Sequence, residues 1–336
     1  MARAIAVVED DESIREMLRY YFQSVGYAVR AYESGEALFA GEEGQSLPAL
    51  AVGVYFFGPR VLTLTLTSMA ACLVFEWLYR VVTRQSYTLP DGSALVTGLL
   101  FTLTLPVSVP YWLVIVGAAF AMIVVKGMCG GLGQNVFNPA LGARAFLMLL
   151  WPQYLVRFPE VSSWLSVGQV DMVSSATPLH HLVMPSLPDV SLMDMFLGNM
   201  VGSMGEVCTL AILLGGIYLI ARKVISWRIP AAYLGTVAVL TLIFSRGQSP
   251  VLFMAYHLLG GGLMLGAFFM ATDYATSPVT PVGQLVYGLG CGVLTVIFRY
   301  FGLFPEGVTY AILIMNACAW AIDRITPPRR FGGAVK

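Results

Sequence analysis

The sequence predicts an all-α polytopic membrane protein that is preceded by a small α/β fragment. Of its 336 residues, 57% are hydrophobic and 11% are charged, whereas soluble domains carry about 25% charged residues. Ten apolar runs follow one another from Leu47 to Ile322, and such runs cross bilayers as helices. The net charge is zero and the three histidines are scattered, so a basic surface for nucleic acid is excluded.

The first 45 residues differ from the rest of the chain. We expect strands at Arg3 to Val8 and Tyr27 to Ala31, helices at 12–25 and 34–43, and an acidic cluster at 9–11. This order resembles the opening of a response-regulator receiver domain, where acidic residues hold Mg²⁺. The third strand with its acceptor Asp, and the later Thr/Ser and Lys, are absent. We therefore expect 1–45 to be non-functional in phosphorelay, and to reflect a gene fusion or a sequence-assembly join near Gly44 to Leu47.

The apolar runs that define the membrane domain begin directly after this fragment. They are 47–57, 61–82, 94–105, 111–125, 136–151, 207–220, 229–244, 251–271, 282–301 and 308–322. A helix needs about 20 residues to cross the hydrocarbon layer. The run 47–57 is too short, so we interpret it as the second half of a truncated first helix.

Basic residues predict how the chain is oriented. If the crossings alternate, one face collects the residues Arg80, Arg84, Lys126, Arg222, Lys223, Arg228, Arg324, Arg329, Arg330 and Lys336. The positive-inside rule makes this face cytoplasmic, and it includes the tail 332–336. Arg157 and Arg246 are single exceptions. The long loop 152–204 then lies on the extracytoplasmic side.

The runs divide into five before this loop and five after it. An odd number per half requires any structural repeat to be inverted in the membrane. The third run of each half contains a segment, 98–106 in the first and 266–274 in the second, that begins with Gly, contains Thr and ends at Pro or polar residues. This pattern is typical of broken helices that line a central site.

Ionisable or strongly polar residues occur near or inside the runs. They are Glu76, Lys126, Arg144, Glu206, His257, Asp273, Arg299, Asn316 and Asp323. Because most lie near run ends, we expect most to snorkel towards the headgroups. His257 has no second ligand at metal spacing, and the five cysteines form no CxxC pair, so we expect neither a metal site nor a disulfide framework.

Two polar segments are candidates for binding a cofactor. The stretch Asp171 to Leu179 gathers hydroxyls before Pro178; its residues could equally form a turn or helix cap. The segment Lys126 to Pro139 holds four glycines with Asn135 and Asn138. Such turns let backbone amides approach a phosphate or flavin, but a tight hairpin has the same pattern.

These segments resemble a known family. Ser174-Ser175-Ala176-Thr177 is similar to the Ser-Gly-Ala-Thr flavinylation motif of the membrane subunits Rnf D and NqrB, with Ser175 in place of Gly. Further motifs of the same family occur in family order at 133–140, 205–206, 260–263, 271–274 and 305–316. The resemblance covers Leu47 to Phe331, which places an NqrB/RnfD-type membrane domain at 46–331.

The resemblance implies a covalent FMN, attached through a phosphoester to Thr177 and flanked by Asp171, Ser174, Ser175 and Ala176. It also implies a second, non-covalent flavin, for which the turn at Asn135 is a candidate position. Asp273 and Glu206 are candidates for influencing ion movement or flavin electrostatics.

The implied function is a flavin-carrying electron-transport subunit of the Rnf complex, a Na⁺- or H⁺-translocating ferredoxin:NAD⁺ oxidoreductase. The subunit would be incomplete as an enzyme alone. It would sit in the bacterial inner membrane with the Rnf subunits A, B, C, E and G, after maturation by a flavin transferase. The alternative is a channel or solute transporter of urea-channel-like inverted architecture, which needs no flavin loop.

Overall fold

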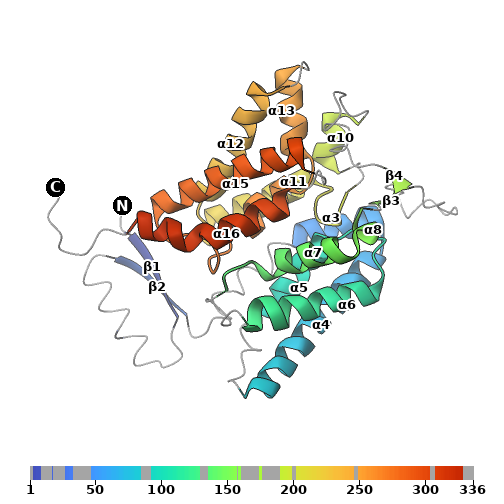
Figure 1. The fold of residues 1–336 in the computed structure, drawn as a ribbon, viewed down its shortest axis with the longest axis vertical. Helices are drawn as coiled ribbons and strands as arrows, with labels where there is room; N and C mark the ends of the chain where they lie inside the picture. The colour runs from blue at the N-terminus through green and yellow to red at the C-terminus, as the bar shows by residue number, and fades with distance from the viewer. Residues whose placement is uncertain are drawn as a thin grey trace.

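The computed structural model describes residues 3–8, 17, 27–32, 47–84, 92–128, 135–156, 158–159, 174–175, 190–198, 202–245, 249–302 and 307–327. Helices dominate, as predicted (Figure 1). The elements are β1 (Arg3–Val8), β2 (Tyr27–Tyr32), α3 (Leu47–Phe57), α4 (Arg60–Thr83), α5 (Ser93–Leu103), α6 (Tyr111–Ala119), the π-helix η2 (Phe120–Met128), α7 (Pro139–Leu150), α8 (Pro152–Leu155), β3 (Phe158–Pro159), β4 (Ser174–Ser175), α10 (Leu192–Leu197), α11 (Thr209–Ala221), α12 (Arg228–Ile243), α13 (Pro250–Leu259), α14 (Leu263–Leu265), the π-helix η3 (Gly266–Met270), α15 (Pro281–Phe301) and α16 (Val308–Ile325).

All ten apolar runs contain helix. Among the described residues, four helical segments are long and apolar enough to cross a membrane: α4, α6 with η2, α15 and α16. The pair formed by α13 and the segment Leu263–Met270 is a fifth candidate, bent by 64°. The helices α5, α7, α11 and α12 are shorter. The 11 residues of α3 reach about 16 Å, roughly half of the hydrocarbon thickness.

The two halves have matching neighbours. α4 packs on α5 and on α6 with η2, and in the second half α12 packs on α13 and α15. α7 packs on η2 as α16 packs on α15. The halves meet where α3 contacts α11 and α7 contacts α16. This pattern fits the predicted repeat of two five-helix halves.

The third run is interrupted in both halves, as predicted, but in the second half the break precedes the predicted segment 266–274. In the first half, helix α5 ends at Leu103 and Thr104 to Pro110 is non-helical. In the second half, Gly260 is extended, and Gly261 and Gly262 have φ of 69° and 64°. Positive φ is accessible to glycine at little cost, so the glycines allow the sharp bend between α13 and α14.

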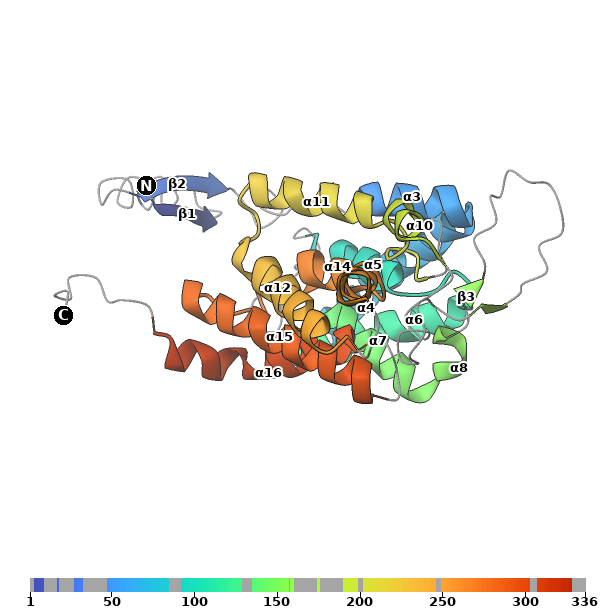
Figure 2. The same ribbon diagram turned by 90° about the horizontal axis from the view of Figure 1, so that it is seen from above.

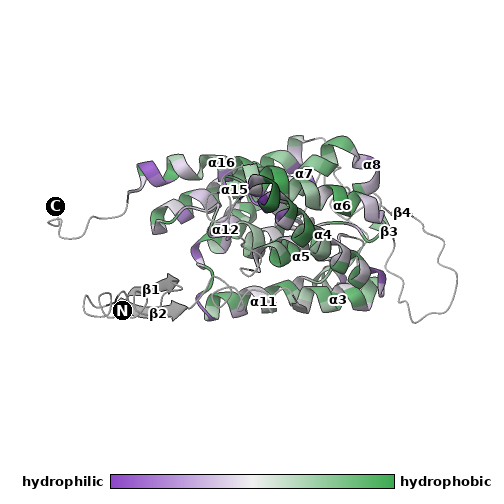
Figure 3. Cartoon of the chain, turned by 90° about the horizontal axis from the view of Figure 1, so that it is seen from below, coloured by the Kyte–Doolittle hydropathy of each residue, from purple (hydrophilic) through white to green (hydrophobic). Residues whose placement is uncertain are grey.

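Polar groups mark the end of the helical bundle at which α16 finishes. Figure 2 shows the C-terminal end of α16 at the opposite end of the bundle from β3, as alternating crossings require. Most of the helices consist largely of hydrophobic residues, whereas the C-terminal end of α16 is hydrophilic (Figure 3). There Arg324 stacks 3.9 Å from the ring centroid of the exposed Trp320. Paired basic and aromatic side chains suit a membrane interface.

The N-terminal fragment contains the two predicted strands. β1 and β2 pair in parallel, in a register that runs from Arg3↔Tyr27 to Val8↔Tyr32. Parallel strands require a crossover connection, in agreement with the predicted strand–helix–strand order. The helices predicted at 12–25 and 34–43 lie outside the described residues, apart from the helical Met17.

Candidate cofactor site

Around the hydroxyl-rich motif, the structure describes one short pair of strands, β3 and β4. β3 and β4 pair antiparallel, with Phe158 opposite Ser175 and Pro159 opposite Ser174. This pairing places the backbone of the motif just after α8, at the end of the bundle opposite the C-terminal end of α16 (Figure 2). Asp171, Ala176 and Thr177 lie outside the described residues, so flavin attachment at Thr177 stays a prediction.

A cavity with about 980 Å³ of empty space, open solvent included, lies between the two halves. Its walls come from α5, η2 and the start of α7 in the first half, and from the end of α11, η3 and the turn after η3 in the second. Phe268 and Phe269 are among its apolar walls. This combination of apolar walls and a few polar groups is typical of cofactor sites.

Two asparagines from the glycine-rich segment line this cavity, as the sequence motif suggested. Asn138 is the N-cap of α7, where its side-chain oxygen accepts hydrogen bonds from the backbone N–H groups of Ala140 (3.0 Å) and Leu141 (3.2 Å). Pro139 at the first helical position reinforces this helix start. Asn135 is 7% exposed, and its Oδ1 has no hydrogen-bond partner among the described residues.

Lys126 brings a positive charge to the same cavity. Its Nζ donates to Glu76 Oε1 and to Ser93 Oγ, both at 2.6 Å. Lys126 and Ser93 line the cavity, whereas Glu76 is buried behind them in α4. Arg80 Nε lies 4.0 Å from the same carboxylate oxygen. The sequence marks Lys126 only as an ionisable residue; its position before a glycine-rich turn is the signal that could have identified it.

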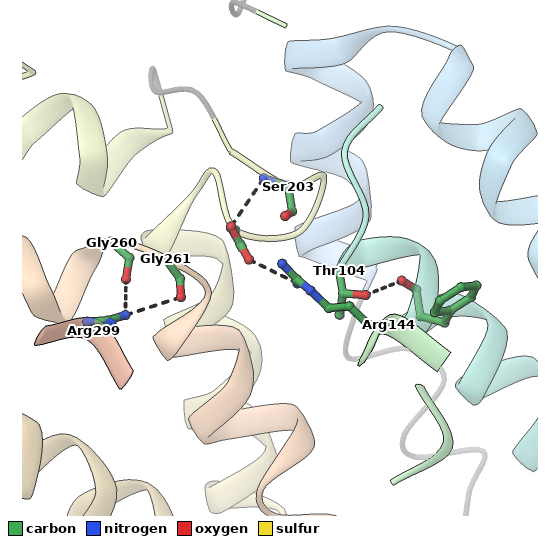
Figure 4. Close-up of polar contacts among 8 residues, drawn as sticks. Thr104, Arg144, Ser203, Gly260, Gly261 and Arg299 are labelled. Atoms are coloured by element: carbon green, nitrogen blue, oxygen red, sulfur yellow. Dashed lines mark hydrogen bonds and ion pairs between the residues drawn. The ribbon is translucent and has the colours of Figure 1, made fainter. Parts of the chain in front are cut away.

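The second candidate site is a group of buried charges between the broken helices (Figure 4). Arg144 of α7 donates from Nη1 to Glu206 Oε1 at 3.5 Å, and Ser203 N donates to Glu206 Oε2 at 3.4 Å. Gly262 lies so close that an added Cβ would meet Glu206 Oε1 at 2.4 Å. Beside them is a cavity of about 10 Å³, and a space of this size holds about one water.

Arg299 of α15 stabilises the break after α13. Its guanidinium is 1% exposed and donates to the carbonyls of Gly260 (2.8 Å) and Gly261 (3.3 Å), and to that of His257. The His257 ring stacks on Tyr300 at a centroid distance of 5.8 Å. Because the break removes helical partners from these carbonyls, Arg299 supplies the hydrogen bonds that they would otherwise lack.

The expectation that most charged residues snorkel to the headgroups is wrong. Seven of the nine polar residues are buried within the protein: Glu76, Lys126, Arg144, Glu206, His257, Arg299 and Asn316. They are buried because each finds polar partners on neighbouring helices, which lowers the cost of removing charge from water. Asp273, which is partly buried, accepts hydrogen bonds from Ala275 N and Thr276 Oγ1, both at 3.2 Å.

Metal ligands do not cluster in the described part of the chain. No group of three or more His, Cys, Asp or Glu side chains there is arranged to hold a metal ion. Cys72, Cys208 and Cys291 are buried as free thiols, and the free thiol of Cys318 is exposed. The polar chemistry of both candidate sites therefore rests on amides, hydroxyls and ion pairs.

Comparison with known proteins identifies the family. The model of the NQR2, RnfD, RnfE family matches residues 45–332. The D subunit of the Na⁺-translocating ferredoxin:NAD⁺ oxidoreductase complex of Acetobacterium woodii is 44% identical over 85% of this chain and 87% of its own length. The D subunit of the proton-translocating complex of Clostridium ljungdahlii is 41% identical, with 85% and 88% covered.

A more distant relative has a matching description. The D subunit of the ion-translocating oxidoreductase complex of Methanosarcina acetivorans is 36% identical over 85% of this chain and 88% of its own length. The predicted family is thus confirmed over the whole membrane domain. The chain belongs to the NQR2, RnfD, RnfE family, the membrane subunits of redox-driven ion translocases.

Proposed function

We propose that this protein is a flavin-carrying electron relay of an Rnf-type ferredoxin:NAD⁺ oxidoreductase complex that translocates Na⁺ or H⁺. The observation that carries the proposal is the Ser174-Ser175-Ala176-Thr177 motif within a chain of this family. Thr177 would bind FMN through a phosphoester, within the motif Asp171 to Thr177. Flavins supply one- and two-electron redox chemistry, and the protein supplies position and electrostatics.

The proposed setting follows from the same family assignment. The protein would work in the bacterial inner membrane with Rnf subunits A, B, C, E and G. Its loop 152–204 would face the extracytoplasmic side, opposite the basic end of α16. A covalent link is useful there, because cofactor lost on that side could not be replaced from a cytoplasmic pool.

A second, non-covalent flavin would occupy the cavity lined by Asn135. The residues fit such a group: the walls include the apolar rings of Phe268 and Phe269, and polar groups come from both halves, Lys126 and Asn135 in the first and Asp273 in the second. A flavin ring has the same division between an apolar dimethylbenzene end and a polar pyrimidine end. Asn135 Oδ1, which has no partner among the described residues, could accept a hydrogen bond from the N3–H of the pyrimidine end.

Flavin fluorescence tests the covalent site. The chain is co-expressed with a flavin transferase and separated on a denaturing gel, where we expect a fluorescent band. Thr177→Ala should abolish the fluorescence, while Ser174→Ala, the matched control, should retain it. Ser175→Gly restores the family motif and should label at least as well as the natural chain. A mass spectrum of the tryptic loop peptide without FMN in the matured natural chain would refute the electron-relay proposal and favour the channel or transporter alternative.

A further inference from the structure

A buried ion pair stands behind one wall of the Asn135 cavity. Lys126, 3% exposed, points its Nζ towards Glu76 and Ser93, 2.6 Å from an oxygen of each. The three residues come from η2, α4 and α5, and only Lys126 and Ser93 of the three reach the cavity surface. The positive end of the pair therefore faces the cavity, and the negative end lies behind it.

Packing alone does not account for this arrangement. Burying an ion pair costs several kcal/mol per ion in desolvation, and apolar residues of similar volume often stabilise a fold as well or better. A lysine near a helix end can also reach the headgroups by snorkelling. Here Lys126 turns inward from the last turn of the π-helix η2. Such helices are rare and are frequent at functional sites.

The unused hydrogen-bonding capacity of the cavity has a definite pattern. A lysine ammonium has three donors, and Lys126 uses two of them, on Glu76 and Ser93, among the described residues. Asn135 Oδ1 in the same cavity has no donor among those residues. Besides the carboxylate of Asp273, which also lines the cavity and accepts hydrogen bonds from Ala275 and Thr276, the cavity thus offers one cationic donor and one neutral acceptor. A flavin pyrimidine edge offers the complement, an acceptor at N1–C2=O beside a donor at N3–H.

We infer that Lys126 is the positioning and potential-setting residue of the cavity flavin: it binds the N1–C2=O edge, and Glu76 moderates its charge. The inference rests on the proposed second flavin. Addition of two electrons from the redox partners of the complex and one proton from water to an oxidised flavin leaves one negative charge on the N1–C2=O edge. A fixed cation beside this edge stabilises the reduced form and raises the reduction potential, since charge near N1 tunes the flavin.

The test uses the full chain produced without a flavin transferase, so that it carries no covalent flavin. The purified protein is loaded with riboflavin, the bound riboflavin is quantified, and its reduction potential is measured from the visible flavin absorbance. The variants are Lys126→Gln, which removes the cation, and Glu76→Gln, which removes the counter-charge at constant shape. Thr67→Val, a neutral change at a partly exposed position of α4 outside the cavity lining, is the matched control.

Lys126→Gln should lower the ratio of reduced to oxidised flavin at a fixed potential about tenfold, which is about 30 mV for a two-electron couple. Glu76→Gln should shift the ratio in the opposite direction, and Thr67→Val should leave it unchanged. If Lys126→Gln fails to fold because the Glu76 carboxylate loses its nearest cation, the double variant Lys126→Gln/Glu76→Gln replaces it. Its potential should then lie below that of Glu76→Gln alone.

Failure of the two proposals can be distinguished. If the natural chain does not bind riboflavin stoichiometrically, the second flavin and the role of Lys126 are both refuted. If riboflavin binds but the Lys126→Gln and Glu76→Gln potentials move together or stay constant, the inference about Lys126 is refuted while the second flavin stands. A purely structural role would change the amount of bound riboflavin without opposite shifts in potential.

Discussion

The ion pair between Arg144 and Glu206 permits a quantitative test of how the two halves are joined. Arg144 belongs to α7, and Glu206 lies in the turn before α11, which begins at Thr209. At their separation of 3.5 Å, the Coulomb attraction is about 5 kcal/mol with an effective dielectric constant of ~20. Both side chains are almost completely buried, so much of this attraction is offset by desolvation.

Arg144→Met and Glu206→Gln should each lower the free energy of unfolding by about 3–5 kcal/mol, because each leaves one buried charge without its counter-ion. The double variant Arg144→Met/Glu206→Gln removes both charges, and the Gln oxygen can still accept the Ser203 N–H. We expect it to lose about 2 kcal/mol or less, which makes the coupling energy several kcal/mol.

Reversible unfolding of the four proteins in mixed detergent micelles measures the cycle. A coupling energy within about 0.5 kcal/mol of zero would mean that the two residues act independently. The pair would then contribute nothing to joining the halves, and the reasoning from its buried geometry would be refuted.

Further predictions concern a close contact and a titrating group. Gly205→Ala would place a Cβ 2.7 Å from Leu103 Cβ and 3.0 Å from its carbonyl oxygen, so it should lower the melting temperature. Gly235→Ala, with nothing within 4 Å, should be neutral or stabilising by up to about 1 kcal/mol; equal melting temperatures for the two variants would contradict the packing argument. Desolvation raises the pKa of Asp273, which lies in the turn between η3 and α15, against the opposing hydrogen bonds from Ala275 and Thr276. A raised folded-state pKa means that stability is lost as pH rises through it, so thermal unfolding should show that Asp273→Asn gains more stability at about pH 8 than at about pH 4; a gain that is the same at both pH values would contradict it.

The helices could be predicted from the sequence because lipid imposes a simple rule. Every spanning backbone must satisfy its own hydrogen bonds in an apolar run of known length, and all ten runs contain helix. The break after α13 lies at Gly260 to Gly262, ahead of the segment 266–274 where the sequence pattern predicted it; positive φ at Gly261 and Gly262 is nevertheless a local property of the chain that glycine permits.

The charged interior could not be predicted in the same way. Glu76 and Lys126 are 50 positions apart, and Arg144 and Glu206 are 62 apart. The sequence places Lys126 and Glu206 at the edges of runs, where snorkelling and burial are equally compatible with the position. It places Glu76 and Arg144 inside runs without showing which residues they contact. The partner that decides between snorkelling and burial is fixed by tertiary packing. Asn135 could be proposed as a cofactor-site candidate from the sequence because its motif is local. The hydrogen bond of Ser93 with Lys126 depends instead on tertiary packing, which brings α5 to η2.

The contacts of Arg299 have a consequence for the barrier that a coupling complex must maintain. A helix interrupted inside a bilayer exposes backbone carbonyls, and water entering to solvate them would open a leak. Here the Arg299 guanidinium donates hydrogen bonds to the carbonyls of Gly260 and Gly261. The seam beside them, next to Glu206, contains a cavity of only about 10 Å³. The carbonyls at this break thus find their hydrogen-bond donor within the protein, which removes one reason for water to enter along the seam.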